Sequence, residues 1–400
     1  MRERLAVVAV AMMALGLFIQ MSGKVWLESN SAQNSQVYIW LLLPSLLVVL
    51  FGGIKRFGLD VYIVPWVCYL FWVALSTAWA RDLSDDPFSL VKRGAFIALY
   101  ILAICFFLRQ SEVVFRRAVM TAVVVIALGA LVSMVHQFLV LDRPFAYRAF
   151  RIDRSGIGDF ANYGWPVAAG IFHGAVATWA LGFALDKSAS RKSFFFWFSI
   201  FTVLVVYVLL TYTRGAWFGL LVSGVSVIVI QNTRRGWLVL AAGVTVCIVA
   251  VSYLWHDLVF EVTTRQLSGR GPIWNYFLSQ MPGYWWQGHG LGTEFKYVWP
   301  RRGMVSPHAH SLYLQQIYDS GLISLFLLLG GIVTLFYKCW SKRDLFWIRI
   351  AIPALLFALV AMLTDVERIF TRPGDYWTLF WLPVAVLLAS SSLVNNAQKN

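Results

Sequence analysis

Long apolar runs separated by short charged gaps constrain this chain more than any other feature. Of its 400 residues, 60% are hydrophobic and only 13% are charged, whereas a soluble protein would carry about a quarter charged residues. Because a bilayer core offers no water to the backbone, such runs must satisfy their polar groups internally, as helices of about 20 residues. The sequence therefore predicts an all-α integral membrane protein in contact with membrane lipids.

We expect about 12 transmembrane helices. The predicted spans are 5–22, 37–53, 61–79, 95–108, 118–138, 163–185, 195–211, 215–231, 237–254, 312–337, 346–363 and 376–393. They divide the chain into nine helices in 1–254, one large loop with short interfacial helices in 255–311, and three helices in 312–400. The loop is too short and too aromatic for a separate soluble domain, so we expect one structural unit.

Basic residues in alternate gaps predict the orientation. They are Lys55, Arg56, Arg109, Arg116, Arg117, Lys187, Arg191, Lys192, Arg234, Arg235, Lys338, Lys342 and Arg343. The positive-inside rule places these gaps, and with them both termini, in the cytoplasm. The net charge of +14 needs no nucleic acid to explain it, and none is expected as a partner.

The opposite loops also carry cations, against this trend. They are Arg143, Arg148, Arg151, Arg154, Arg214, Arg265, Arg270, Lys296, Arg301, Arg302, Arg368 and Arg372. Arginines in long outer loops can simply snorkel to lipid phosphates. The alternative is contact with an anionic ligand, because the planar guanidinium fork suits phosphate oxygens better than an ammonium group does.

The large loop contains a predicted amphipathic helix that begins near Pro272, with Ile273, Trp274, Phe277, Leu278 and Met281 on its apolar face. Arg270 would lie just before its amino terminus, where the helix dipole favours anions. The alternative is that Arg270 anchors the helix at the membrane surface. Gly288, Gly290 and Gly292 follow and indicate tight backbone turns.

The end of the loop predicts another helix, with Ser306 as N-cap and Pro307 at the first position. His308 and His310 would then lie in its opening turn. Two residues apart, they cannot share a helical face, so a metal pair is not expected. We expect one of them to point into a site. A polar interruption at Asp319-Ser320-Gly321 precedes the next hydrophobic stretch.

Three segments together resemble the bacterial O-antigen ligase and polymerase family, the WaaL/Wzy-type membrane glycosyltransferases. They are TYTRGAW around Arg214, the arginine before the tryptophan-containing helix with the later GHGLGTEF, and HAHSLYLQQIYDSGLISL. The motifs cover roughly 200–340, and only the hydrophobic pattern extends the likeness further. By this resemblance Arg214 and Arg270 would hold a lipid-linked pyrophosphate. His310, directly before Ser311, would be the catalytic histidine, with His308 as the alternative. Arg148, Arg151 and Arg154 rest on charge alone as substrate contacts.

The resemblance implies an O-antigen ligase that moves a glycan from undecaprenyl pyrophosphate to a sugar hydroxyl of lipid A-core at the periplasmic face of the inner membrane, with inversion. A pyrophosphate is already a good leaving group, so the reaction needs cations on that group and a base near the hydroxyl. Arginines and a neutral histidine supply these. We expect no metal ion and no cofactor, because the outer acids include no Asp-x-Asp pair.

Three alternatives remain open. A polymerase would share the donor but extend another lipid-linked glycan, and a protein O-oligosaccharyltransferase would modify a protein. A secondary transporter is a different class, which places its site at the bilayer midplane between repeated halves. The chain has no convincing internal repeat, and its polar residues gather in the outer loops.

Overall fold

The computed structural model describes residues 2–53, 57, 59–83, 85–264, 269–300 and 303–397. Five of the loop cations named above lie outside the described residues: Lys55, Arg56, Arg265, Arg301 and Arg302.

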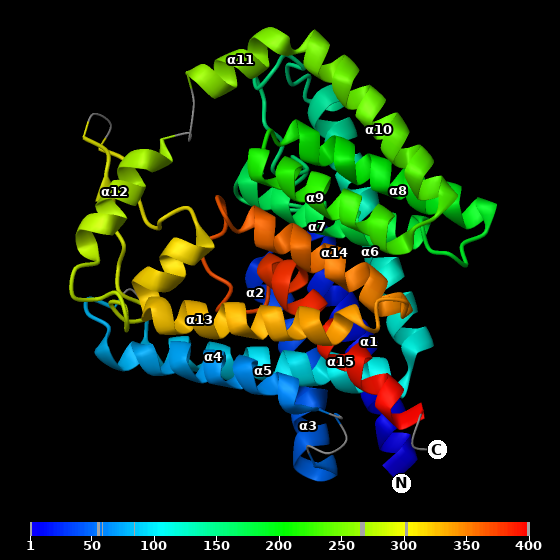
Figure 1. Ribbon diagram of the computed structural model, residues 1–400, viewed down its shortest axis with the longest axis vertical. Coiled ribbons are helices and arrows are strands. Elements are labelled where there is room, and N and C mark those ends of the chain that lie inside the picture. Colours follow the sequence, from blue (N-terminus) through cyan, green and yellow to red (C-terminus); the bar gives the residue numbers. More distant parts are fainter. Residues whose placement is uncertain are drawn as a thin grey trace.

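The described chain is mostly helical, with long loops and almost no strand (Figure 1). Its first part contains α1 (Arg2–Trp26), α2 (Asn30–Val37), η1 (Tyr38–Leu42), α3 (Leu43–Gly52), η3 (Val61–Ile63), α4 (Val64–Leu75), η4 (Ser76–Trp79), α5 (Pro87–Gln110), α6 (Glu112–Val135), η5 (His136–Val140) and α7 (Pro166–Ala184). Its second part contains α8 (Arg191–Leu210), α9 (Arg214–Gln231), α10 (Arg234–Tyr253), α11 (Trp255–Thr263), α12 (Arg270–Gln280), α13 (Leu312–Trp340), α14 (Phe346–Ala361), η6 (Trp377–Trp381) and α15 (Leu382–Ala397). Two-residue strands, β1 (Tyr297–Val298) and β2 (Val305–Ser306), pair antiparallel, with Tyr297 opposite Ser306.

Ten helices of the described chain are long and apolar enough to cross a membrane. Two shorter apolar helices, Phe346–Ala361 and Trp377–Ser390, follow them. Each of these segments overlaps one predicted span. The prediction of an all-α integral membrane protein is confirmed.

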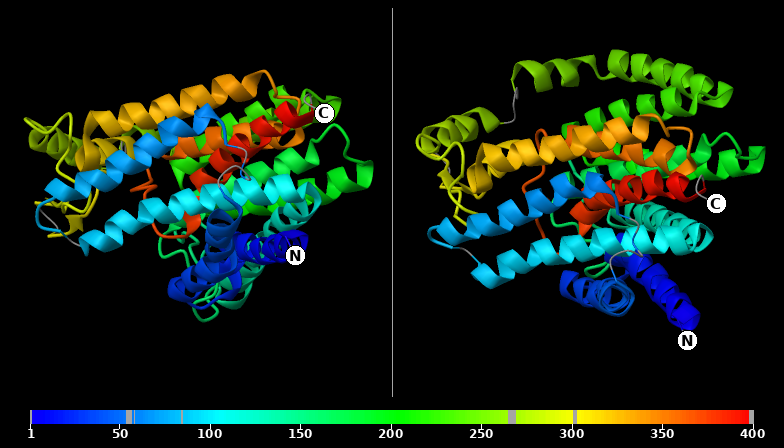
Figure 2. Two further views of the ribbon diagram at one scale, coloured as in Figure 1. Left: turned by 90° about the horizontal axis from the view of Figure 1, so that it is seen from below. Right: turned by 60° about the horizontal axis from the view of Figure 1, so that its bottom comes forward.

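Helix α7 lies at the centre of the bundle and packs on α8, α9 and α14. Most of its length is buried, and glycines let its neighbours approach closely. A Cβ added at Gly174 would strike the ring of Phe357 on α14, and one at Gly170 would meet Thr213 just before α9. Small residues at helix contacts are the usual device of membrane proteins, where close van der Waals packing holds the helices together. By contrast, α10 lies at the edge of the bundle (Figure 2), with nearly all of its side chains exposed.

The loops gather at two ends of the bundle. Helix α12 and the strands mark one end, which we call the α12 end, and the labelled termini lie away from it (Figure 1). Lys24 pairs with Asp375 at 2.7 Å, and the Lys24 carbonyl accepts a hydrogen bond from the amide of Ala161. At the opposite end Arg349 pairs with Asp186 at 2.7 Å, and Lys187 lies 3.4 Å from Asp344. Each of these contacts joins loops or helix ends for which the sequence predicts the same side of the membrane.

Candidate functional site

The two histidines lie in an irregular segment and not in a helix. Helix α13 begins at Leu312 with Ser311 as N-cap, and Ser306 belongs to β2, so the predicted helix start at Ser306 and Pro307 is wrong. His310 has a φ of +51°, which no right-handed helix accommodates. The carbonyl of Ala309 accepts a hydrogen bond from the Trp274 indole at 3.0 Å, and its amide donates to the Gln315 side chain at 2.9 Å.

Outside a helix, His308 and His310 come together. Their ring centroids lie 4.1 Å apart, and the His310 amide donates to His308 Nδ1 at 3.2 Å. Burial lowers the pKa of His310 to about 4, with further lowering by His308 and Arg270. Burial and then the charge of Arg368 lower the pKa of His308 to about 4. Both rings are therefore neutral at pH 7, as a proton acceptor must be.

Arg270 is the first residue of α12 and directly follows the N-cap residue Gly269, whose φ of 82° lies in the left-handed region. The helix therefore starts slightly before the predicted Pro272. On its apolar face Ile273, Phe277 and Met281 are buried, whereas Leu278 is exposed. The buried residues pack against Ala309, Ile317 and Tyr318, so this face holds α12 against the histidine segment and the start of α13.

Asp365 is the partner that the sequence analysis did not single out. Its carboxylate forms an ion pair with Arg270 and accepts a hydrogen bond from the Thr364 hydroxyl at 2.9 Å. Its side chain is 5% exposed. A Cβ added at Gly215 would strike the Asp365 carboxylate, so the first turn of α9 approaches it closely. Asp365 thus joins Arg270 to the segment that carries Arg214, and its charge also acts on His310.

The 139–162 loop reaches the same place through two of its arginines. The guanidinium of Arg151 donates to the Thr211 carbonyl at 2.8 Å, and that of Arg148 lies 6.0 Å from the Tyr212 ring centroid. Both residues thus contact the short turn before Arg214. Arg154 instead pairs with the adjacent Asp153 at 3.0 Å, and Arg143 lies over the Phe150 ring.

A second ion pair fixes the start of α13. Arg368 donates to Asp319 through two nitrogens, at 2.6 and 3.1 Å, and to Glu367 at 2.6 Å. Asp319 also accepts from Gln315 at 2.9 Å, the residue that holds the Ala309 amide. Burial is the main cause of a raised Glu367 pKa. Asp319 is thus linked to the Ala309 amide, which lies between the histidines, through the side chain of Gln315.

The glycine loop packs directly onto that interruption. Gly321 departs from helical geometry inside α13, with φ 73° and ψ 179°. The amides of His289 and Gly290 donate to the Tyr318 and Asp319 carbonyls at 2.7 and 2.9 Å, and that of Leu322 donates to the Trp285 carbonyl at 2.8 Å. Gly288, Gly290 and Gly292 all have positive φ, which confirms the predicted tight turns. His289 lies between the rings of Tyr284 and Tyr318, a packing position.

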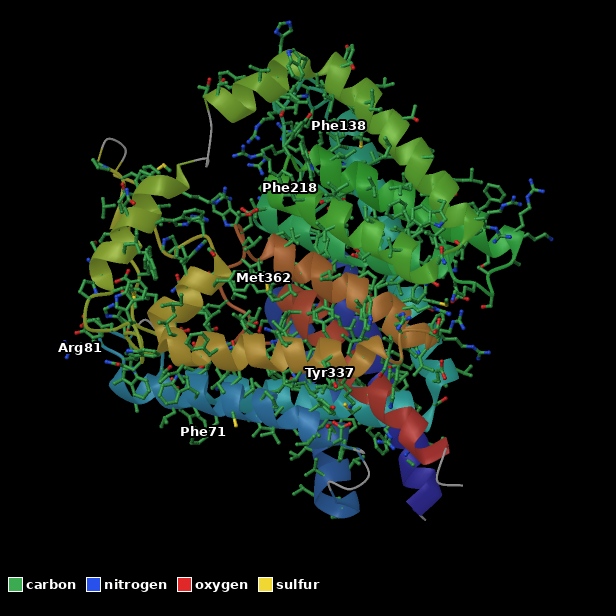
Figure 3. All side chains as sticks on the ribbon, viewed as in Figure 1. Phe71, Arg81, Phe138, Phe218, Tyr337 and Met362 are labelled. Carbon is green, nitrogen blue, oxygen red and sulfur yellow. The ribbon has the colours of Figure 1, made fainter. Side chains whose placement is uncertain are left out.

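The structure thus brings His308, His310, Arg270 and the start of α9 together at the α12 end. The carbonyl of Met362, a residue labelled in Figure 3, accepts a hydrogen bond from the Leu312 amide. Met362 also begins the loop that carries Asp365 and Arg368. Within the described part of the chain, no group of three His, Cys, Asp or Glu side chains is placed to hold a metal ion. The arrangement combines guanidinium groups for an anion with a neutral imidazole beside them.

Comparisons with known proteins agree with the resemblance that the motifs carry. A family model described as O-antigen ligase matches residues 198–329. An O-antigen ligase of Pseudomonas aeruginosa is 25% identical over 377 residues, which cover 94% of this chain and 89% of that protein. The resemblance to the O-antigen ligase and polymerase family is confirmed, and the chain is an all-α membrane protein similar to O-antigen ligases. The matched segment contains Arg214, Arg270 and both histidines but ends before Asp365.

Proposed function

We propose that the protein is an O-antigen ligase of the bacterial inner membrane. It would transfer a finished glycan from undecaprenyl pyrophosphate to a sugar hydroxyl of lipid A-core, without a metal ion and with inversion of the anomeric centre. The α12 end would face the periplasm, with both termini in the cytoplasm. The observation that carries the proposal is the convergence of Arg270, Asp365, the first turn of α9 and the His308–His310 pair.

In the proposed reaction, the acceptor hydroxyl oxygen attacks the anomeric carbon from the face opposite the pyrophosphate. The bond between that carbon and the pyrophosphate oxygen breaks, and the hydroxyl proton passes to His310. Arg270 and Arg214 neutralise the charge that develops on the departing pyrophosphate, which is the largest electrostatic demand of such a step. His308 and the Arg148–Arg151 loop would complete the donor site, whereas Arg154, paired with Asp153, would have no direct part in it.

Asp365 has a definite part in this proposal. Before the donor binds, the Asp365 carboxylate forms an ion pair with the guanidinium of Arg270, in the way that a phosphate oxygen would. The ion pair holds Arg270 at the start of α12 and beside His310. A bound pyrophosphate would share that guanidinium, and its negative charge would raise the pKa of His310 and make the ring a better base.

The test is glycan transfer by the purified protein from a lipid-pyrophosphate donor to lipid A-core, with a chelator present. We expect product from the wild type, none from His310→Ala, and more from His308→Ala than from His310→Ala. Matched amounts of folded variant protein, checked by size-exclusion chromatography, serve as the control. Full activity of His310→Ala would overturn its role as base, and activity lost on chelation would overturn metal independence.

A deletion strain separates the ligase from the polymerase, which would use the same kind of donor. Loss of all O-antigen on lipid A-core, with lipid-linked polymer accumulating, identifies a ligase. A single core-linked repeat unit identifies a polymerase, and unchanged lipopolysaccharide with loss of a protein-linked glycan identifies a protein O-oligosaccharyltransferase.

A further inference from the structure

A pocket at the far end of α13 has no part in the proposed reaction. It is a cavity of about 790 Å³, and we call it the α13 basic pocket. It is lined by Asp60, Tyr62, Phe336, Tyr337, Lys338, Trp340, Ser341, Lys342 and Arg343. Helix α13 starts beside His310 and has 29 residues, so at 1.5 Å per residue the pocket lies roughly 40 Å from the histidines. Tyr337, labelled in Figure 3, marks this part of the helix.

The lining carries an excess of positive charge. Its described residues include three cations, Lys338, Lys342 and Arg343, and one acid, Asp60. Lys338 is 8% exposed and is already engaged, because it pairs with Asp60 and lies 4.7 Å from the Tyr62 ring centroid. That internal pair joins Lys338 to the one acid among the described lining residues. With three cations and one acid, the described lining carries a net positive charge, which attracts anions.

The rim of the pocket has the composition of a membrane interface. Trp340 and Tyr337 are large aromatic side chains that are 55% and 78% exposed. The guanidinium of Arg343 lies 5.3 Å from the Trp340 ring centroid and donates to the Trp340 carbonyl at 3.0 Å. Aromatic rings next to basic residues at the end of a spanning helix are typical of the headgroup level of a bilayer.

We propose that the α13 basic pocket binds the phosphate headgroup of an anionic glycerophospholipid. Basic pockets between transmembrane helices recognise such headgroups, and each nearby Lys or Arg adds to the attraction. The exposed rings of Tyr337 and Trp340 would lie against the glycerol and the first acyl carbons, whereas a soluble phosphate would gain nothing from them. The site is independent of the proposed transfer reaction.

The test measures lipid binding to the purified full-length protein in detergent, by native mass spectrometry and by the thermal unfolding midpoint. The probes are phosphatidylglycerol, phosphatidylcholine and inorganic phosphate at equal concentrations. We expect phosphatidylglycerol alone to be retained and to raise the midpoint. The double variant Lys342→Gln/Arg343→Gln should lower its affinity about tenfold or more, and Arg343→Gln alone should give part of that loss.

The matched control is Arg234→Gln/Arg235→Gln, which removes the same charge at the start of α10, where both residues are exposed. It should leave lipid affinity unchanged. An equal loss in both double variants would mean general attraction to a basic protein surface and would overturn the site. Equal protection by inorganic phosphate would identify a soluble anion as the ligand and overturn the lipid assignment.

Discussion

At the scale of single residues, Asp365 explains why cations that oppose the topological trend lie where they do. Its buried carboxylate contacts Arg270 and lies against Gly215, the residue after Arg214. Asp365 therefore joins Arg270 to the backbone of the segment that carries Arg214. Removal of that acid would take a buried counter-charge away from a largely buried guanidinium, which is costly.

The first prediction concerns the guanidinium fork of Arg270. Arg270→Ala should lower kcat/KM by an amount equivalent to about 2–4 kcal/mol, because a preorganised charge partner of the leaving group is lost. Arg214→Ala should have a similar effect. Lysine at either position should restore only part of the activity, because it keeps the charge but loses the two parallel donors. Steady-state kinetics check this, and complete rescue by lysine at both positions would argue against bidentate phosphate contact.

The second prediction follows from the low pKa of His310. In the free enzyme this pKa is about 4, because burial, His308 and Arg270 disfavour the charged ring. A base must be neutral, so kcat/KM should stay level from pH 8 to about pH 5 and fall only as the pH approaches 4. The acidic limb of kcat should lie at higher pH, because the bound pyrophosphate favours the protonated ring. A kcat/KM limb at the ordinary histidine pKa near 6.5 would contradict this structure of the site.

The third prediction separates the arginines of the 139–162 loop. Arg151 donates a charged hydrogen bond to the Thr211 carbonyl and so holds the turn before Arg214. Arg151→Gln should raise KM or lower kcat roughly tenfold, the value of a charged hydrogen bond. Arg154→Gln is the matched control, because an exposed pair with Asp153 contributes about 0–1 kcal/mol. Equal kinetic effects of the two substitutions would show that the Arg151 contact does not organise the site.

At the scale of elements, the break in α13 gives the site its shape. Gly321 interrupts the helix, and the Tyr318 and Asp319 carbonyls become acceptors for the glycine loop. Buried backbone carbonyls need hydrogen-bond donors. Because amides of the 284–292 segment supply them, this segment is held against α13. The same interruption lets Asp319 reach Arg368. One irregular position thus connects three segments of the α12 end.

The fourth prediction tests this break. Gly321→Ala should destabilise the protein by about 2 kcal/mol or more, since the position lies in a backbone region that is essentially restricted to glycine. The added Cβ would also strike the Trp286 carbonyl. Gly330→Ala, in a regular turn of the same helix with nothing within 4 Å of the new Cβ, should be neutral or stabilising. Thermal unfolding in detergent compares the two, and equal midpoints would contradict the packing described here.

The sequence predicts the spans well and the histidine segment badly, for the same physical reason. A run of about twenty apolar residues in a bilayer satisfies its backbone hydrogen bonds by forming a helix, so hydropathy alone locates the spans. The start of α13 depends on side-chain contacts that the local sequence does not show. The Ala309 amide donates a hydrogen bond to the Gln315 side chain, and the Ala309 carbonyl accepts one from the Trp274 indole. With these contacts the helix begins at Leu312 and not at the Ser306–Pro307 pattern, which the local sequence favours. Asp365 was visible only as one outer acid among several, because its role depends on proximity to Arg270 and Gly215.

At the scale of the whole molecule, charge is distributed differently at the two ends. At the opposite end, Lys338, Lys187 and Arg349 pair with Asp60, Asp344 and Asp186. At the α12 end, arginines converge on buried acids around the histidines. Lys338 and Lys187 of the opposite end lie in gaps for which the positive-inside rule predicts the cytoplasm. At the α12 end, Arg270, Arg368 and Arg151 instead hold together segments of the candidate site.

The fifth prediction is the orientation that this distribution implies. If the α12 end faces the periplasm, a cysteine at Ser279 on α12 should react with a membrane-impermeant maleimide in cells whose outer membrane alone is permeabilised. A cysteine at Lys192, at the start of α8, should react only after the inner membrane is also opened. Both positions are exposed.

The background variant replaces the four native cysteines with alanine, because Cys68 and Cys247 are also exposed. Cys105 and Cys339 are buried, and their thiols approach the Ala385 and Leu387 carbonyls only at 3.8 and 3.7 Å, so their loss should be tolerated. Basic loops resist translocation across the inner membrane, and thirteen Lys and Arg residues in the predicted inner gaps favour this single orientation. Labelling of Lys192→Cys before Ser279→Cys would reverse it and would place the His308–His310 pair in the cytoplasm, where a donor presented in the periplasm could not reach it.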